Sequence, residues 1–102
     1  MILPRPATLK KYGLTEEDWV ELYNLQGGVC PVCERPMEKR IVVDHVHVRG
    51  FKKMSDENKR KWIRGLTDWY CNHYHLARGI TVKKSKNVTA YLERFEKRLN
   101  NE

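Results

Sequence analysis

The sequence predicts a single small domain in which helices and a short strand are combined with a metal-binding loop. Three stretches carry this prediction: a helix that begins after Thr15, a pair of cysteines at Cys30 and Cys33, and the apolar segment IVVDHVHV at residues 41–48. A chain of 102 residues buries only a modest fraction of its surface, so a bound metal would add stability that the core alone lacks.

The composition indicates the kind of partner and compartment. The formal net charge of +7 favours a polyanionic partner, most simply nucleic acid, although many small basic proteins have no such partner. The three cysteines are an odd number, and their spacing suits a metal site in a reducing compartment better than a disulfide framework. No segment approaches the ~20 apolar residues needed to cross a bilayer, and the first residues do not form a signal peptide. We therefore expect a soluble intracellular protein without a membrane partner.

The N-terminal region divides into a basic arm and the first helix. Residues 1–14 are basic and interrupted by prolines, which predicts an extended arm before a domain at residues 15–100. Thr15 is a suitable N-cap, and three acidic residues follow it, where they favour the positive end of a helix. Trp19 and Tyr23 have helical spacing and are expected to pack in the core before a glycine pair ends the helix.

The next segment, GGVCPVCERPM, holds Cys30 and Cys33 in a turn rich in glycine and proline. Thiolates at this spacing can bind one Zn²⁺ from a tight loop whose backbone amides face the sulfurs. A thioredoxin-like redox motif shares the spacing, but such motifs lie in a βαβ pattern that this sequence does not show. A pair of inert buried cysteines is the remaining alternative.

An acid and two histidines interrupt the apolar strand expected at residues 41–48. Each buried polar side chain would cost roughly 1–3 kcal/mol without a partner, so the interruption indicates either chemistry or a strand whose polar residues face water. Asp44 and His45 offer an oxygen ligand beside a nitrogen base, the groups used in metal-assisted hydrolysis. Strict alternation puts Asp44 on one face and His45 with His47 on the other. We expect a twist or break at Asp44–His45, because a metal ligand and a base that act on one phosphate must converge.

Lysine and arginine dominate residues 51–64, around a short capped segment that is expected to begin near Ser55. A basic segment of this kind is either a solvated face or a contact to the DNA backbone without base specificity. The candidate DNA-binding residues are Lys52, Lys53, Lys59, Arg60 and Lys61.

The C-terminal third supplies the other half of the candidate site and a last helix. Cys71 has a spacing suited to completing a zinc site. A helix that begins here places Asn72 and His75 on one face and turns Cys71 away by about 100°. Apolar residues then recur at helical spacing over residues 88–99, which predicts an amphipathic helix capped by Asn87. This helix is expected to close the core or to form a homodimer interface.

The order of these motifs resembles that of a known family. Cys-x-x-Cys is followed by Asp-His-x-His, by Arg-Gly-Leu and by Cys-Asn, and a helix closes the chain. This order is similar to that of the phage recombination endonuclease VII family of HNH, or ββα-metal (His-Me finger), nucleases. The resemblance covers roughly residues 12–100 and implies a small α+β domain, in which zinc stabilises the fold while a β-hairpin and a helix hold the catalytic metal.

The resemblance also implies roles for individual residues. Asp44 and Asn72 match the family's ligands of the catalytic ion, Mg²⁺ or Mn²⁺, and His45 matches its general base. His47 matches a further histidine that orients the phosphate or supports the site. His75 is a candidate third ligand or phosphate contact.

Two departures from the family pattern matter. The family has four cysteines in two pairs, but Asp68 stands where the third is expected. The implied ligands of the structural zinc are therefore Cys30, Cys33, Cys71 and Asp68, because a carboxylate can bind Zn²⁺ at about 2.0–2.2 Å. His75 as the fourth ligand and a site without zinc are the alternatives. The chain also ends soon after the nuclease core, so nicking or double-strand cleavage is expected rather than junction resolution.

The residues and the resemblance together predict a metal-dependent DNA endonuclease of the bacterial or phage-infected host cytoplasm, with His45 as general base. One alternative is a non-catalytic zinc-binding, DNA-binding module on the same scaffold. The other is a redox or metal-buffering protein that uses the cysteines.

Overall fold

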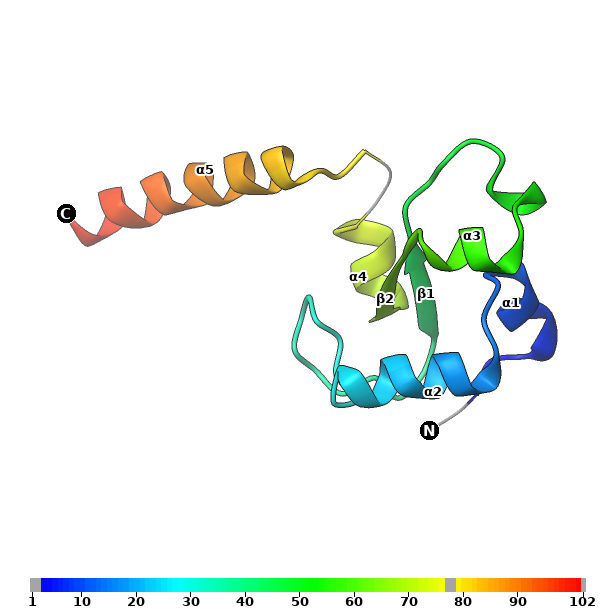
Figure 1. The fold of residues 1–102 in the computed structure, drawn as a ribbon. Helices are drawn as coiled ribbons and strands as arrows, with labels where there is room; N and C mark the ends of the chain where they lie inside the picture. The colour runs from blue at the N-terminus through cyan, green and yellow to red at the C-terminus, as the bar shows by residue number, and fades with distance from the viewer. Residues whose placement is uncertain (1–2, 77–78, 102) are drawn as a thin grey trace.

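The computed structural model describes residues 3–76 and 79–101, and it combines helices with a small sheet (Figure 1). The elements in chain order are α1 (Pro6–Lys11), α2 (Glu16–Leu25), β1 (Ile41–His45), the 3₁₀ helix η1 (Phe51–Lys53), α3 (Asp56–Arg60), β2 (Ile63–Asp68), α4 (Trp69–Tyr74) and α5 (Val82–Asn100). The predicted α+β class is confirmed.

The two strands pair in antiparallel fashion, and β2 leads directly into α4. Asp44 pairs with Gly65, whereas His45 pairs with Ile63, so the register shifts between Asp44 and His45. Arg64 is the extra residue of β2 at this point, which makes the irregularity a β-bulge of the kind that re-aims a side chain. The predicted break at Asp44–His45 is confirmed.

The N-terminal segment contains a helix, so the prediction of an extended arm is wrong. α1 begins at Pro6, whose ring fixes a helical φ and whose missing N–H is not needed in the first turn. Leu9 and Leu14 are 5% and 8% exposed and belong to the hydrophobic core. Prolines are typical of extended chain, but a proline at the first helical position favours a helix start equally well.

The predicted start of α2 is confirmed by a reciprocal cap. The Asp18 N–H donates to the Thr15 hydroxyl at 3.1 Å, and the Thr15 N–H donates to the Asp18 carboxylate at 2.9 Å. The second of these bonds is the main reason why the pKa of Asp18 lies below its usual value. Trp19 is only 1% exposed, and its ring stacks on that of Tyr23 with centroids 5.5 Å apart. Both aromatic residues therefore pack as expected.

Gln26, which follows α2, ties this helix to the sheet. Its side-chain amide donates to the Leu66 carbonyl at 2.7 Å, and its side-chain oxygen accepts the Leu66 N–H at 2.9 Å. A Cβ at Gly65 would lie 2.7 Å from that oxygen, so a larger residue would push Gln26 away. Leu66 itself is fully buried in the core. Position 65 therefore requires glycine because a Cβ would collide with Gln26, whereas position 66 requires an apolar side chain because it fills the core.

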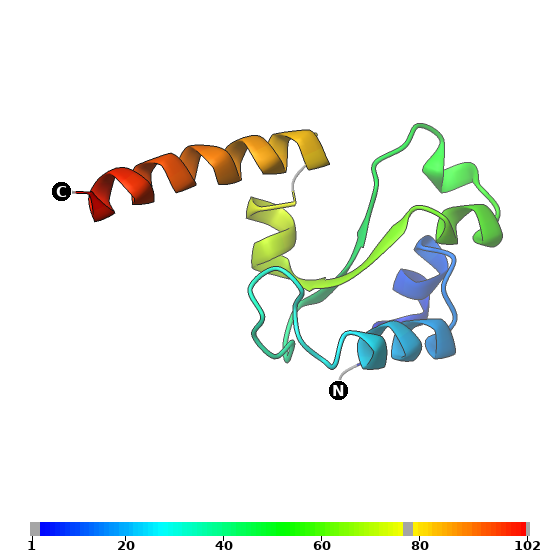
Figure 2. The same ribbon diagram turned by 60° about the vertical axis from the view of Figure 1, so that its left-hand side comes forward.

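The last helix does not close the core, so that prediction is wrong. The apolar residues of α5 that form the predicted stripe are between 48% and 66% exposed, and Figures 1 and 2 show the helix running away from the rest of the fold. α5 also begins earlier than expected: Thr81, not Asn87, is its N-cap, and accepts the Lys84 N–H at 3.0 Å. Amphipathic spacing shows that a face is apolar but not what covers it. The predicted homodimer interface stays a prediction. None of the described helices combines the length and the apolar character that crossing a bilayer requires.

Candidate functional site

Four candidate metal ligands come together where the loop after α2 meets the junction of β2 and α4. Cys30 and Cys33 lie on the loop, and Asp68 and Cys71 lie at the junction. Their donor atoms all lie within 4.8 Å of one another, close enough for bonds of about 2.0–2.3 Å to a single ion. Thiols with a carboxylate suit zinc, so this cluster could hold a metal such as zinc.

The cysteine loop directs backbone amides toward Cys30. A bridge between Val29 and Pro36 closes the loop, and its tight turn holds Glu34 at a φ of 62°. Burial alone would raise the pKa of Cys30, but backbone N–H groups of the loop and of Asp68 donate to its sulfur and hold the pKa below its usual value. The loop therefore favours the thiolate that a metal needs.

Asp68 has two roles at the start of α4. Its Oδ1 accepts the Cys71 N–H at 2.7 Å, which caps the helix, and its Oδ2 lies 3.0 Å from the Cys33 sulfur. The backbone contact first, and the Cys33 contact second, lower the pKa of Asp68. Burial first, and then the Asp68 carboxylate, raise the pKa of Cys71 to about 12. Cys71 therefore ionises near neutral pH only when a cation offsets the surrounding negative charge.

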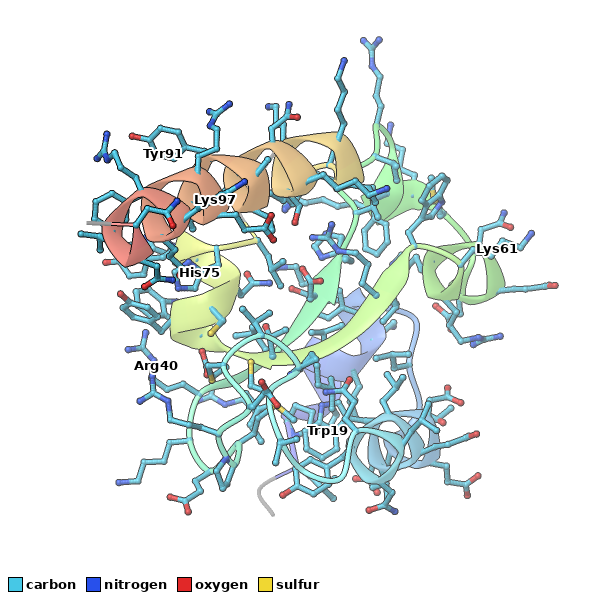
Figure 3. All side chains as sticks on the ribbon, turned by 90° about the vertical axis from the view of Figure 1, so that its left-hand side faces the viewer. Trp19, Arg40, Lys61, His75, Tyr91 and Lys97 are labelled. Atoms are coloured by element: carbon cyan, nitrogen blue, oxygen red, sulfur yellow. The ribbon has the colours of Figure 1, made fainter. Side chains whose placement is uncertain are left out.

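His75, the alternative fourth ligand, lies at the other end of α4. Figure 3 labels this residue on α4. It is the C-cap of that helix, and its ring centroid is 5.5 Å from that of Tyr70. Asp68 is the residue that completes the group of donors with the three cysteines. The arrangement thus favours Asp68 over His75 as the fourth ligand.

A second polar cluster centres on Asp44, which is only 4% exposed. The Arg64 guanidinium donates from Nε to Oδ2 at 2.7 Å and from Nη2 to Oδ1 at 2.9 Å. The side-chain amide of Asn72 donates to Oδ1 at 3.0 Å. Hydrogen bonding to Asp44 raises the pKa of Arg64 above its usual value. β1, the bulge of β2 and α4 each contribute one side chain to this cluster, and Asp44 and Asn72 meet as predicted.

His45 faces a different set of neighbours and lines an open pocket of about 700 Å³. Its ring centroid lies 4.7 Å from those of both His47 and Phe51. Burial is the main cause that lowers the pKa of His45; the neighbouring His47 and Lys11 lower it further, and Asp44 partly opposes them. His45 is therefore neutral at pH 7 and able to accept a proton.

The family model of recombination endonuclease VII matches residues 6–96 of the sequence. The chain belongs to this family. It is also 36% identical over 70 residues to the Gene 59 protein of Mycobacterium phage L5, and 37% identical over 70 residues to the Gene 59 protein of Mycobacterium phage D29. Each alignment covers 67% of this chain but only 36% of the relative, so the chain spans much less than the full length of these relatives. No solved structure matches the chain.

Three lysines of this endonuclease VII family member line the pocket that holds His45: Lys11, Lys52 and Lys53. Lys52 and Lys53 were predicted to bind DNA, and the structure places them beside the candidate base. Lys11 was missed, because residues 1–14 were expected to form an extended arm and not a helix packed against the fold. The available signal was Pro6, because proline is favoured at the first helical position; the burial of Leu9 then orients α1.

Lys59 is buried, which argues against the predicted contact with DNA. It is 9% exposed, and its Nζ lies 5.8 Å from the centroid of the Phe51 ring, because the inner face of the short α3 packs against the fold. The Arg60 guanidinium makes an intramolecular hydrogen bond: its Nη1 donates to the Gly13 carbonyl at 3.0 Å. Lys61 is exposed and projects from the end of α3 (Figure 3). DNA contact by Arg60 and Lys61 stays a prediction.

The predicted site residues thus form two neighbouring groups. Asp44 and Asn72 make one, and His45 and His47 make the other, joined through the chain at the register shift. The role of His75 stays a prediction. The sequence did not predict Arg64 as a partner of Asp44. The Arg-Gly-Leu motif contains this arginine, but its contact with Asp44 follows only from the strand register.

Proposed function

We propose that this endonuclease VII family member is a metal-dependent DNA endonuclease that hydrolyses phosphodiester bonds, by nicking or double-strand cleavage. The observation that carries the proposal is the buried Asp44 carboxylate, which contacts Asn72 next to a basic pocket lined by His45. Family membership supports the same reaction class.

Asp44 and Asn72 suit a hard divalent cation, Mg²⁺ or Mn²⁺. Such ions prefer oxygen ligands, and a carboxylate and an amide can each supply one if the Asn72 amide, which now donates to Asp44, turns its oxygen toward the ion. When bound, the ion would stabilise negative charge on the phosphate and on the departing 3′ oxygen. His75 is the candidate third ligand or phosphate contact in this proposal.

His45 is proposed as the general base. As a neutral imidazole it takes a proton from water, which attacks the phosphorus in line with the leaving oxygen. His47 packs on His45 and would hold its ring in place or contact the phosphate. Lys11, Lys52 and Lys53 around the same pocket would neutralise the DNA backbone.

The cysteine cluster is proposed to hold a structural zinc that takes no part in the chemistry. It connects the loop after α2 to the start of α4, and α4 carries Asn72. A zinc ion there would keep Asn72 in register with Asp44 and add folding energy to a small core. The order β1, β2, α4 around the Asp44 group supports the assignment to the ββα-metal, or HNH, class.

A supercoiled-plasmid assay tests the proposal. We expect relaxation or linearisation with Mg²⁺ or Mn²⁺ and none with EDTA. His45→Ala should lose nearly all cleavage and retain DNA binding and its far-UV circular dichroism. His73→Ala is the matched control, because His73 is exposed and stacks on Trp69 away from the pocket. Undiminished nicking by His45→Ala would refute the assignment of the base. DNA binding without any metal-dependent cleavage would indicate a non-catalytic module.

A further inference from the structure

Asp44, which is proposed to bind a metal, already has hydrogen-bond partners on both of its carboxylate oxygens. Three N–H groups, two from Arg64 and one from Asn72, occupy both of its oxygens at 2.7–3.0 Å. The guanidinium makes a bidentate ion pair, the strongest geometry available to a carboxylate and an arginine. A cationic group therefore already lies against the carboxylate that is proposed to bind the ion.

The strand register explains why Arg64 reaches this position. Arg64 is the bulged residue of β2, between Ile63 and Gly65, which pair with His45 and Asp44. A bulge turns one side chain out of the regular alternation, and here it directs Arg64 onto the neighbouring strand. The Arg64 side chain remains 35% exposed while that of Asp44 is 6% exposed. The guanidinium therefore has a route to solvent, whereas the carboxylate does not.

We propose that Arg64 is a positioning residue that competes with the catalytic divalent ion for Asp44 and gives way when the ion binds. A divalent ion and a guanidinium on one carboxylate repel each other, so loading of the ion requires Arg64 to move. A DNA phosphate offers the displaced guanidinium a bidentate partner of the same geometry. Arg64 thereby couples ion binding to DNA binding. This inference rests on the proposed catalytic ion at Asp44 and Asn72.

Arg64 also has a role before the ion arrives. An unpaired carboxylate that is almost fully buried is costly, and Arg64 supplies the opposite charge and the two hydrogen bonds that hold Asp44 in place. Removing Arg64 should therefore destabilise the protein in EDTA and increase the stabilisation that the ion provides when it binds. A residue with a purely structural role would destabilise both forms equally.

The test measures Mn²⁺ binding to the zinc-loaded chain in a His45→Ala background, in which DNA is not cut. Free Mn²⁺ is followed by electron paramagnetic resonance, with and without a short DNA duplex. Without DNA, Arg64→Gln should bind Mn²⁺ about tenfold more tightly than the Arg64 protein. This factor is the low end of the range expected for loss of a charged hydrogen-bonded pair, because the pair is partly exposed. Arg64→Lys, which keeps the charge but loses the bidentate geometry, should lie between. Arg49→Gln, an exposed arginine after β1, is the matched control for charge loss.

DNA should strengthen Mn²⁺ binding more in the Arg64 protein than in Arg64→Gln. If Arg64→Gln is poorly folded in EDTA, the thermal midpoint is the readout, and Mn²⁺ should raise it more in this variant than in the Arg64 protein. Equal or weaker Mn²⁺ binding by Arg64→Gln would overturn the inference while leaving the proposed function intact. Mn²⁺ binding that Asp44→Ala does not alter would instead overturn the catalytic ion site, and the inference with it.

Discussion

Substitution of Asp68 tests whether this side chain binds zinc in addition to capping α4. Asparagine caps a helix as well as aspartate does, so Asp68→Asn keeps an acceptor for the Cys71 N–H but removes the carboxylate that lies 3.0 Å from the Cys33 sulfur. Asp68→Ala removes both contacts. In EDTA, the free energy of unfolding should change by less than about 0.5 kcal/mol in Asp68→Asn and fall by about 1 kcal/mol in Asp68→Ala.

The zinc-bound proteins should differ more. Loss of a residue that merely supports a zinc ligand costs about 10–100-fold in affinity, so loss of a direct ligand should cost at least about tenfold. A tenfold larger dissociation constant for zinc removes about 1.4 kcal/mol from the free energy of unfolding at saturating zinc. Asp68→Asn should therefore appear nearly normal in EDTA and clearly destabilised with zinc.

The assay combines urea unfolding, with zinc and with EDTA, and zinc competition against a chromophoric chelator. Asp56→Asn, which removes an exposed acid from the first turn of α3, is the control for charge alone. If Asp68→Asn holds zinc as tightly as the unmodified chain, Asp68 is a helix cap only and the four-ligand site is wrong.

Three further outcomes follow from the structure. Burial and neighbouring groups lower the pKa of His45, and only the neutral ring accepts a proton. The cleavage rate should therefore fall as the pH drops through a midpoint below 6.5. A rate that still increases between about pH 7 and 8 would contradict His45 as the general base. Leu66→Ala should lower the unfolding free energy by about 2–5 kcal/mol in urea titrations, because Leu66 is 0% exposed; a loss below about 1 kcal/mol would mean that the site can collapse. Lys53→Gln should weaken DNA binding and reduce the slope of log affinity against log salt by about one, whereas Lys59→Gln should leave that slope unchanged, because Lys59 is buried; equal slopes in the two variants would count against the pocket as the DNA contact.

Local features of the fold were predictable because they depend on neighbouring residues. The reciprocal cap of α2 needs only the Thr15 hydroxyl and the acid three positions later, and Ser55 likewise caps α3 by accepting the Asn58 N–H at 3.3 Å. The break at Asp44–His45 was predictable for a different reason: side chains with convergent chemistry cannot lie on opposite faces of a regular strand.

Features that depend on distant contacts were not predictable from the pattern alone. The stripe of α5 has a clear helical period, but period does not identify the surface that covers it. Lys59 is indistinguishable by composition from the lysines around it, and its burial follows from the position of Phe51. Arg64 lies 20 positions from Asp44, and only the bulge brings the two together. The cysteine cluster was predictable because Asp68 keeps the spacing of a missing cysteine.

The contact between Gln26 and Leu66 has a consequence for the behaviour of the molecule in solution. The side-chain amide of Gln26 offers Leu66 one donor and one acceptor, as a peptide group of a third strand would. The outer edge of a strand in a two-stranded sheet otherwise has unpaired backbone groups, which can pair with strands of other molecules and start aggregation. The Gln26 side chain satisfies the backbone groups at the middle of the β2 edge without a third strand.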